Sequence, residues 1–274
     1  MGRPRGRTFY KMTGSGNDFV VFDVREEPAG ELASVDRIRA LSAHGTGVGA
    51  DGVVFLEPSS NADFRMVYYN SDGSRASFCG NAALCSTRLA VELGAAPPEG
   101  MRFESDAGLI ASRLRDGMPE IDLPAVGDVR ADAAGLVRRP DELRIGYALA
   151  GVPHLVVLCE DVDAIDVAER GKELRWHPTL QPAGANANFV ARQAGGWAMR
   201  TFERGVEGET LACGTGAVAT AILLTTWGLS GDEALLATRS GQPLRVRLRR
   251  ATDGWHPSLG GEGRLVFEAV LREA

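Results

Sequence analysis

Short apolar stretches separated by glycine-bearing turns make up most of the chain. Long helical patterns are few, and the regular alternation of strand and helix that builds a parallel doubly wound sheet is missing. Stretches of this length and composition are typical of strands. The pattern predicts an α+β fold with strands at residues 9–12, 19–24, 52–56, 64–70, 102–104, 109–114, 120–123, 154–158, 197–204, 242–249 and 264–271.

Two cysteines stand 134 residues apart in matching surroundings. Cys79-Gly80-Asn81 and Cys213-Gly214-Thr215 each follow a strand-like stretch and a glycine-bearing turn. Each also begins an apolar, helix-like run that ends at a glycine 15 residues after the cysteine. A helix that is apolar nearly all round is usually buried. The repeat therefore predicts two halves of one design, each made of strand, turn, cysteine and buried helix.

Size and composition agree with a duplicated protein. The 274 residues, of which 44% are hydrophobic and 24% charged, can bury two cores. Residues 124–140 have little strand pattern and are rich in alanine, glycine and aspartate. We therefore expect the link between the two halves in that segment.

Charge and hydropathy exclude other classes of protein. The net charge of -6 argues against nucleic acid as the main partner, because neutralising phosphates needs a basic face. The one basic cluster, Arg245, Arg247, Arg249 and Arg250, alternates as on the solvent face of a strand. No apolar run is as long as a membrane span, and the arginine-bearing start lacks the apolar core of a secretion signal. We expect a cytoplasmic protein that does not act on membranes.

The four cysteines do not resemble a disulfide framework, which belongs to short secreted domains. Their spacing also fits no structural zinc site. Cys85 and Cys159 lie in apolar stretches and are most simply core residues. Cys79 and Cys213 instead stand at predicted helix starts, where the positive end of the helix dipole favours a thiolate. Two such thiols facing one pocket could serve as acid and base.

Seven ordered blocks resemble the bacterial diaminopimelate epimerase family and span nearly the whole chain. The most specific is the last, from Glu203-Arg204-Gly205 to Glu209-Thr-Leu-Ala-Cys-Gly-Thr-Gly216. The others are residues 14–19 (Gly-Ser-Gly-Asn-Asp-Phe), 47–52 (Gly-Val-Gly-Ala-Asp-Gly), 69–74 (Tyr-Asn-Ser-Asp-Gly-Ser), 79–81 (Cys-Gly-Asn), 153–154 (Pro-His) and 186–190 (Asn-Ala-Asn-Phe-Val).

The resemblance implies a fold and an organisation of the site. It implies two pseudo-symmetric α+β domains, each a strand-rich, barrel-like layer around a central helix, with the active site in the cleft between them. The final strand returns to the first domain. The expected halves are therefore residues 1–125 with 262–274, and residues 126–261. The family also implies a homodimer.

Inverting an amino acid at its α-carbon requires one group that removes a proton and another that returns one to the opposite face. The family's catalytic pair maps onto Cys79 and Cys213. The N–H groups of Gly80, Asn81, Gly214 and Thr215 would stabilise the substrate carboxylate. The implied reaction converts LL-diaminopimelate to the meso form, a step toward lysine and peptidoglycan precursors. No cofactor is expected, because neither Lys11 nor Lys172 stands in a pyridoxal phosphate context, and no acidic cluster predicts a metal.

Substrate recognition would rest on three asparagines and one acid-base pair. By resemblance, Asn17, Asn70 and Asn188 line the pocket, although each is also a typical turn residue. Arg204 would bind a distal carboxylate and Glu203 an ammonium group, which suits a diamino dicarboxylic acid. His154 resembles a pocket-edge histidine of the family, with a structural histidine as the alternative interpretation.

Three departures from the family pattern bear on specificity. The first cysteine is followed by Cys-Gly-Asn-Ala-Ala-Leu where the family commonly has Cys-Gly-Asn-Gly-x-Arg. Val152 stands where many members have asparagine before Pro-His, and the loop from Glu203 to Cys213 is one residue longer than usual. A racemase acting on another amino acid therefore remains an alternative. A phenazine-type isomerase, which lacks the cysteine pair, and a non-catalytic thiol or binding protein are weaker ones.

Overall fold

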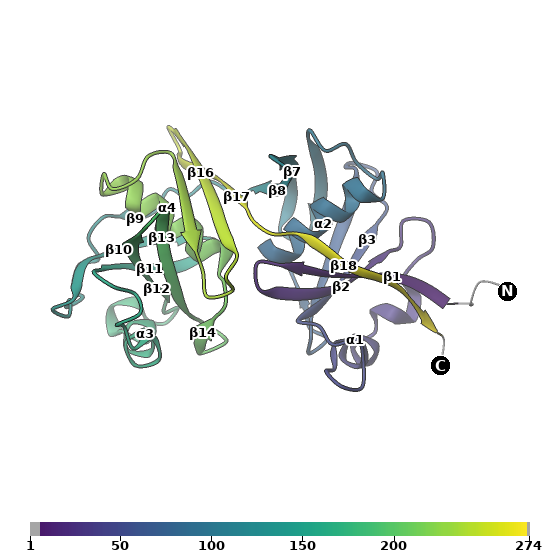
Figure 1. The fold of residues 1–274 in the computed structure, drawn as a ribbon, viewed down its shortest axis with the longest axis horizontal. Helices are drawn as coiled ribbons and strands as arrows, with labels where there is room; N and C mark the ends of the chain where they lie inside the picture. Colours follow the sequence, from purple (N-terminus) through teal and green to yellow (C-terminus); the bar gives the residue numbers. More distant parts are fainter. Residues whose placement is uncertain (1–5, 273–274) are drawn as a thin grey trace. The chain divides into compact units, whose positions relative to one another are not determined.

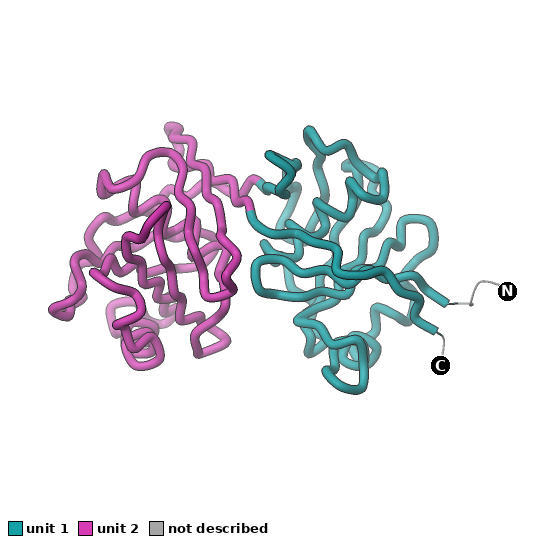
Figure 2. The backbone as a smooth tube through the Cα atoms, in the orientation of Figure 1, with its two compact units in different colours: residues 1–121, 261–274 teal, residues 122–260 magenta. Residues whose placement is uncertain are grey.

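The computed structural model describes residues 6–272, and it divides into two compact units (Figure 2). Unit 1 is Met1–Ile121 with Gly261–Ala274, and unit 2 is Asp122–Gly260. Both are rich in strands and contain one long buried helix (Figure 1). The predicted α+β class with two similar halves is confirmed.

Unit 1 places five strands, one short 3-10 helix and one α-helix before its central helix. Strands β1 and β2 form a hairpin, β2 runs parallel to β3, and β3, β4 and β5 continue antiparallel. After the central helix α2, β6 runs parallel to β4 and is followed by the antiparallel β7 and β8. The last strand, β18, pairs with β1. The elements are β1 (Gly6–Gly14), β2 (Asn17–Asp23), η1 (Gly30–Ala33), α1 (Val35–Ser42), β3 (Gly52–Glu57), β4 (Phe64–Asn70), β5 (Arg75–Ala76), α2 (Gly80–Glu92), β6 (Met101–Ser105), β7 (Gly108–Arg115), β8 (Met118–Asp122) and β18 (Arg264–Arg272).

Unit 2 repeats this topology strand for strand. Strands β10 and β11 pair antiparallel, β11 runs parallel to β12, and β12, β13 and β14 continue antiparallel. After α4, β15 runs parallel to β13, followed by the antiparallel β16 and β17. The elements are β9 (Val129–Arg130), β10 (Glu142–Ala150), β11 (Val152–Cys159), α3 (Val167–Arg175), η2 (Pro178–Leu180), β12 (Asn186–Gln193), β13 (Gly196–Glu203), β14 (Gly208–Thr210), α4 (Gly214–Thr226), β15 (Glu233–Ala237), β16 (Pro243–Ala251) and β17 (Gly254–Gly260).

The two central helices match in length and at both ends. Each has 13 residues and begins after a cysteine in extended conformation, with φ -140° at Cys79 and φ -133° at Cys213. Each ends before a glycine with positive φ, 65° at Gly94 and 72° at Gly228. The N–H groups that follow bond back to Ala90 and Leu224 in the six-to-one pattern of a Schellman motif. The predicted sequence repeat is therefore a structural repeat.

Both central helices are buried because their sequences are apolar nearly all round. Several of their hydroxyls bond within the helix, as when Ser86 donates to the Ala82 carbonyl at 2.8 Å, whereas Thr220 of α4 donates to Met199 Sδ on β13 at 3.4 Å. Strand β10 approaches α4 closely at Gly146, where a Cβ would lie 2.7 Å from Leu223 and 2.9 Å from Trp227. The helices thus hold the two cysteines at fixed positions. None of the helices described between residues 6 and 272 has the length and apolar character needed to cross a membrane.

Candidate active site

In unit 1, Cys79 is half-buried at the residue before α2, and its carbonyl accepts from Ala83 N–H at 2.9 Å. The N–H groups of the first helical turn that follow have no carbonyl partner within the helix. They belong to Gly80 and Asn81, so the half-site presents a thiol together with donors suited to an anion.

An amide chain connects this helix start to the strands. The Asn81 side chain donates to Asn17 Oδ1 at 2.8 Å, and Asn17 donates to Asp51 Oδ2 at 2.8 Å. Asn81 Oδ1 is buried without a hydrogen-bond partner in the described structure. A buried amide oxygen is usually paired, so this acceptor is suited to a donor on a bound molecule.

Asp51 links Asn17 to the turn that holds Asn70. Its carbonyl accepts from Ser71 N–H at 3.1 Å, while Asn70 Nδ2 donates to Ser74 Oγ at 3.0 Å. The sequence analysis did not assign Asp51 to the site. The signal was its position directly before a buried strand, within a block of the family pattern. Asn70 itself bonds within its turn.

In unit 2, Cys213 occupies the same position before α4 but is 6% exposed. Its sulfur lies 3.7 Å from Thr215 Oγ1. Burial and the nearby Glu203 raise the pKa of Cys213 to about 12, against the opposing hydrogen bonds from Thr215 and Gly216. The expectation that the helix start would favour a thiolate is wrong for Cys213, because desolvation outweighs the N–H donors. Cys213 is a thiol at neutral pH.

Asn188 and His154 form a closed polar network. Thr201 Oγ1 donates to Asn188 Oδ1 at 2.9 Å, and Asn188 Nδ2 donates to the Leu155 carbonyl at 2.9 Å. The second Nδ2 proton points to His154 Nδ1 at 3.2 Å. That nitrogen must accept, so the proton of the neutral ring lies on Nε2, which is buried without a partner in the described structure. The Asn188 side chain therefore makes its hydrogen bonds to other groups of the protein, and one of them positions His154.

The environment of His154 keeps its ring neutral. Burial and the charge of Arg204 lower the pKa of His154 to about 3. Glu203 shows the complementary effect, since burial raises its pKa against the hydrogen bond that it accepts from Thr210 Oγ1 at 2.9 Å. The half-site therefore holds a neutral histidine, a desolvated carboxyl group and an arginine.

Arg204 follows strand β13 and is held by its backbone. Its N–H donates to Asn186 Oδ1 at 2.8 Å, and its guanidinium Nη1 donates to the Ala183 carbonyl at 3.3 Å. Asn186 is buried, and the sequence analysis passed over it in favour of Asn188, two residues on. The repeated Asn-Ala-Asn pattern was the signal, but only the strand register separates the two roles. Among residues 6–272 no hydrogen bond engages its other guanidinium nitrogens, which leaves them suited to a ligand.

Each unit thus gathers its own share of the predicted site residues. Unit 1 groups Asn17 and Asn81 around the start of α2, while Asn70 stays in its turn. Unit 2 groups His154, Asn188, Glu203 and Arg204 with Cys213. Gly214 is packed beneath Leu259, where a Cβ would lie 2.8 Å from Cδ2, and Thr215 adjoins the thiol. Across residues 6–272, no group of three or more histidine, cysteine or acidic side chains is placed to hold a metal ion.

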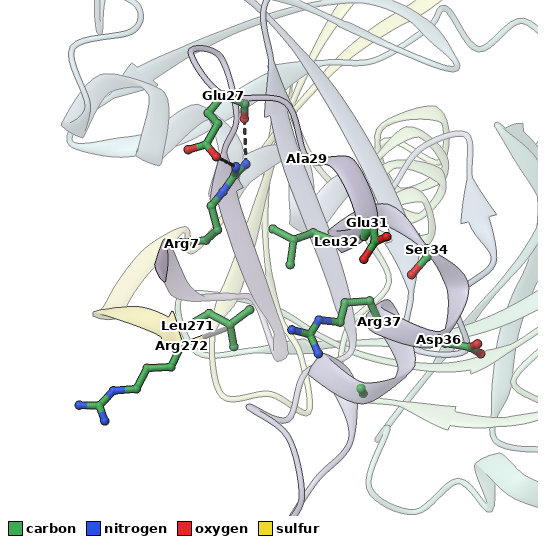
Figure 3. Close-up of a pocket in the computed structure, with 11 residues that line it drawn as sticks. Arg7, Glu27, Ala29, Glu31, Leu32, Ser34, Asp36, Arg37, Leu271 and Arg272 are labelled. Atoms are coloured by element: carbon green, nitrogen blue, oxygen red, sulfur yellow. Dashed lines mark hydrogen bonds and ion pairs between the residues drawn. The ribbon is translucent and has the colours of Figure 1, made fainter. Parts of the chain in front are cut away.

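An open cavity of about 620 Å³ elsewhere in unit 1 contains none of these residues (Figure 3). It lies among η1, α1 and the outer ends of β1 and β18. Arg7 at its edge pairs with Glu27 and also donates to the Glu27 carbonyl at 2.8 Å. Neither cysteine contributes to its lining.

Comparison with known proteins places this arrangement in a family. The family model for diaminopimelate epimerase matches residues 9–123 and 146–252, which include both cysteines. A diaminopimelate epimerase from Gemmatimonas aurantiaca is 51% identical over 274 residues, covering 96% of this chain and 99% of the relative. The chain belongs to the diaminopimelate epimerase family. A second member of that family, from Aquifex aeolicus, is 37% identical and covers 97% of this chain and 98% of its own length.

Solved structures with lower identity share the fold of the diaminopimelate epimerase family. A phenazine biosynthesis protein of the PhzF family from Bacillus anthracis matches with a TM-score of 0.75 and 16% identity, over 97% of this chain and 99% of the other. A hydroxyproline epimerase from Agrobacterium vitis, solved with trans-4-hydroxy-L-proline, matches with a TM-score of 0.64 and 20% identity, over 100% and 95%. At these identities the likeness concerns the fold alone.

Proposed function

We propose that this chain is a diaminopimelate epimerase that interconverts LL- and meso-diaminopimelate without a cofactor, using Cys79 and Cys213 as its two acid-base groups. The observation that carries the proposal is the duplicated cysteine at the start of two equal buried helices, in a member of this family. Epimerisation removes a proton from one face of the α-carbon and returns one to the opposite face, so it needs two acid-base groups. The cysteine at a helix start, which occurs twice in this chain, supplies both.

The two thiols differ in a way that assigns their resting roles. Cys213, with its raised pKa, carries its proton at neutral pH and is the donor. Cys79 takes the α-proton as a thiolate, which leaves a carbanion on the substrate and a thiol at Cys79. Cys213 then gives its proton to the opposite face and becomes the thiolate. The reverse reaction exchanges the two roles, so no external acid or base is consumed.

The helix starts support the charge that develops during proton removal. Removing the α-proton shifts negative charge onto the substrate carboxylate. The first N–H groups of α2 and α4, at Gly80, Asn81, Gly214 and Thr215, are donors without a helical acceptor. They act together with the positive ends of the two helix dipoles. The buried Asn81 Oδ1, which lacks a partner in the described structure, is suited to a substrate ammonium group.

The distal end of the substrate fits the charged groups of unit 2. Arg204 offers a planar pair of donors to a carboxylate, and its backbone is fixed by Asn186. Burial raises the pKa of Glu203, and an ammonium group paired with it would offset that effect and favour the carboxylate. His154, held by Asn188, presents its Nε2 proton to the same region. In unit 1, Asn17 contributes by bonding to Asn81 at the start of α2, and Asn70 contributes from the neighbouring turn.

The proposed substrate and the protein surface also bear on the ligands, location and oligomeric state of the enzyme. We expect a small diamino dicarboxylic acid as the only ligand class, with no role for nucleic acid or membranes, and activity in the cytoplasm. A homodimer fits strand β18, where Val266, Phe267 and Val270 are 47, 45 and 39% exposed. Apolar side chains grouped on one strand are typical of a surface that another chain covers. Sedimentation of the wild type and of Phe267→Glu tests this expectation. If the wild type is a dimer through this surface, the charge introduced at position 267 should convert it into monomers of half the mass.

One observation favours a second candidate function, a racemase for another amino acid. Val152 gives the first position of β11 an apolar side chain, which suits a substrate without a polar group at that point. Such an enzyme would use the same two thiols and differ only in the groups that bind the distal end of the substrate.

Proton exchange in deuterated water tests the proposal directly. Purified protein incubated with LL-diaminopimelate should incorporate deuterium at the α-carbon and form the meso isomer, as followed by NMR and chiral chromatography. Cys79→Ala and Cys213→Ala should each lose this activity by several orders of magnitude, while Cys159→Ala, in the core, should retain it. Faster racemisation of a monocarboxylic amino acid would replace the substrate assignment. Wild-type turnover in either active-site variant would overturn the two-thiol mechanism.

A further inference from the structure

Tyr68 brings a phenol to Cys79 from the neighbouring sheet. It lies on β4, opposite Val54 on β3 and Ala76 on β5, and its side chain is 8% exposed. Its ring packs edge-on against Phe19 with 6.1 Å between centroids. The hydroxyl lies within hydrogen-bonding reach of the Cys79 side chain. The sequence analysis gave Tyr68 no role, because it reads as one more aromatic residue of a strand.

Gly52 supplies the space that the phenol occupies. A Cβ at this position would lie 2.5 Å from Tyr68 Cε2 and 3.0 Å from its hydroxyl oxygen. The ring is thus confined between Phe19 and the Gly52 backbone, so the direction of its O–H group is set by packing. A glycine inside a strand often marks such a close approach.

The structural repeat shows that this contact is particular to unit 1. The strand ladders place Thr201 of unit 2 at the position of Tyr68, since Thr201 pairs with Asn188 and Thr210 as Tyr68 pairs with Val54 and Ala76. The Thr201 hydroxyl donates to Asn188. Cys213 instead has the Thr215 hydroxyl beside it. The duplicated frame therefore gives the two thiols different partners.

The phenol stays protonated at every working pH. Burial raises the pKa of Tyr68 well above 10, and the facing Cys79, Asp51 and Asp72 are all acidic groups that raise it further. A group that always carries its proton is a permanent donor. A hydrogen bond donated to an anion is roughly twice as strong as one between neutral groups, so this donor favours thiolate over thiol.

We propose that Tyr68 is a positioning residue that donates its O–H group to the Cys79 thiolate and so prepares Cys79 to act as the base. The inference rests on the proposed function for its place in the reaction, although the thiol chemistry itself can be measured without substrate. It explains how two cysteines at equivalent helix starts acquire opposite resting roles. Cys213 is kept as a thiol by burial, and Cys79 is kept as a thiolate by the phenol.

Alkylation of Cys79 provides the test. In a Cys213→Ala background, the rate of iodoacetamide labelling at Cys79 is followed against pH by mass spectrometry, with and without Tyr68→Phe. Losing a charged hydrogen bond should raise the midpoint of this profile by about one to two pH units. With Cys213 intact, the acidic limb of kcat/KM for diaminopimelate should move up by the same amount. Tyr69→Phe is the matched control, since Tyr69 packs edge-on against Phe55 and should change neither profile.

The outcomes separate this inference from the proposed function. A raised labelling midpoint supports the role of Tyr68 even if diaminopimelate is not turned over, a result that would overturn the substrate alone. An unchanged midpoint in folded Tyr68→Phe overturns the inference, as does a lower kcat with no pH shift, which is what a purely structural role would give. If Tyr68→Phe does not fold, 3-fluorotyrosine incorporation replaces it. The more acidic phenol should then lower the midpoint, and no change would overturn the role.

Discussion

The Asn188 side chain donates a hydrogen bond to His154 Nδ1 across 3.2 Å, and this contact fixes the proton of the histidine on Nε2. Both residues are fully buried on adjacent parallel strands, β11 and β12. A protonated His154 would lose this acceptor and would place its charge beside Arg204. The ring is therefore built to remain neutral.

This environment predicts a pH-dependent loss of stability. Because the pKa of His154 falls to about 3 on folding, its contribution is present above the ordinary value and is lost as the pH falls below it. Between pH 7 and pH 5 the wild type should lose roughly 2 kcal/mol of unfolding free energy through this group. His154→Asn keeps an acceptor at the δ position and does not titrate. Urea denaturation at the two pH values should show the smaller loss for the variant, and equal losses would contradict the interpretation.

The two active-site thiols should differ sharply in reactivity. With a pKa of about 12, Cys213 is ionised at pH 8 in on the order of one molecule in ten thousand. Iodoacetamide at pH 8 should therefore label Cys79 well before Cys213, as measured by peptide mapping. Cys79→Ala supplies the control, in which label should reach Cys213 only slowly. Equal labelling of both sites would show that burial does not govern Cys213.

Two of the elements that the sequence analysis overlooked contain a glycine inside the element. Strand β10 contains Gly146 and helix α3 contains Gly171, and each glycine reads locally as a break. In the structure both permit a close approach, Gly146 to α4 and Gly171 to the ring of Phe202. Such a glycine is required by a neighbour far away in the sequence. Strand β17 was overlooked likewise, because Pro257 reads as a turn although it pairs with Leu248 on β16.

Some features of the candidate site could be predicted from the sequence and others could not. The cysteines and helix starts were predictable because the repeat is written in the sequence. The separate roles of Asn186 and Asn188 were not, because both point to one side of β12 and only their long-range partners distinguish them. The raised pKa of Cys213 was equally inaccessible. It depends on how completely other segments cover a helix start, which no local pattern records.

The packing role of Gly146 can be measured. Gly146→Ala places a methyl group against Leu223 and the rigid ring of Trp227, so we expect a loss of about 1 to 3 kcal/mol in unfolding free energy. Gly231→Ala is the control, because a Cβ there meets nothing within 4 Å. Urea denaturation of both variants should separate them clearly. A Gly146→Ala protein as stable as the control would mean that α4 can shift without cost.

Arg204 should determine recognition of the distal carboxylate. Arg204→Lys keeps the charge but removes the planar pair of donors, so kcat/KM for diaminopimelate should fall about 10- to 150-fold, the equivalent of one charged hydrogen bond. Arg249→Lys, on an exposed position of β16, should leave kcat/KM unchanged. Substrates without the distal carboxylate should be poor for the wild type and little affected by Arg204→Lys. Full activity of Arg204→Lys on diaminopimelate would remove Arg204 from the distal site.

Val152 is the position where the internal repeat predicts the effect of a substitution. The ladders of the two hairpins place Val152 where unit 1 has Asn17, because Val152 pairs with Ala150 as Asn17 pairs with Gly14. Asn17 bonds to Asn81 at the start of α2, and the corresponding residue at the start of α4 is Thr215. The neighbouring Gly151 already lies close to Thr215, since a Cβ there would be 3.8 Å from its methyl group. An asparagine at position 152 would therefore bring an amide to the start of α4, as Asn17 does for α2.

We expect Val152→Asn to preserve kcat/KM for diaminopimelate or to raise it by about 2- to 12-fold, the range of one neutral hydrogen bond. Val152→Leu is the control for size, because it changes the shape of the side chain without adding an amide, and it should not improve turnover. Steady-state kinetics with LL-diaminopimelate and a panel of monocarboxylic amino acids provide the measurement. If Val152→Asn instead loses activity on diaminopimelate while the wild type prefers a monocarboxylic substrate, Val152 marks a pocket adapted to that other amino acid. The two thiols would keep their roles in either case, because the residue at position 152 affects substrate recognition and takes no part in transfer of the α-proton.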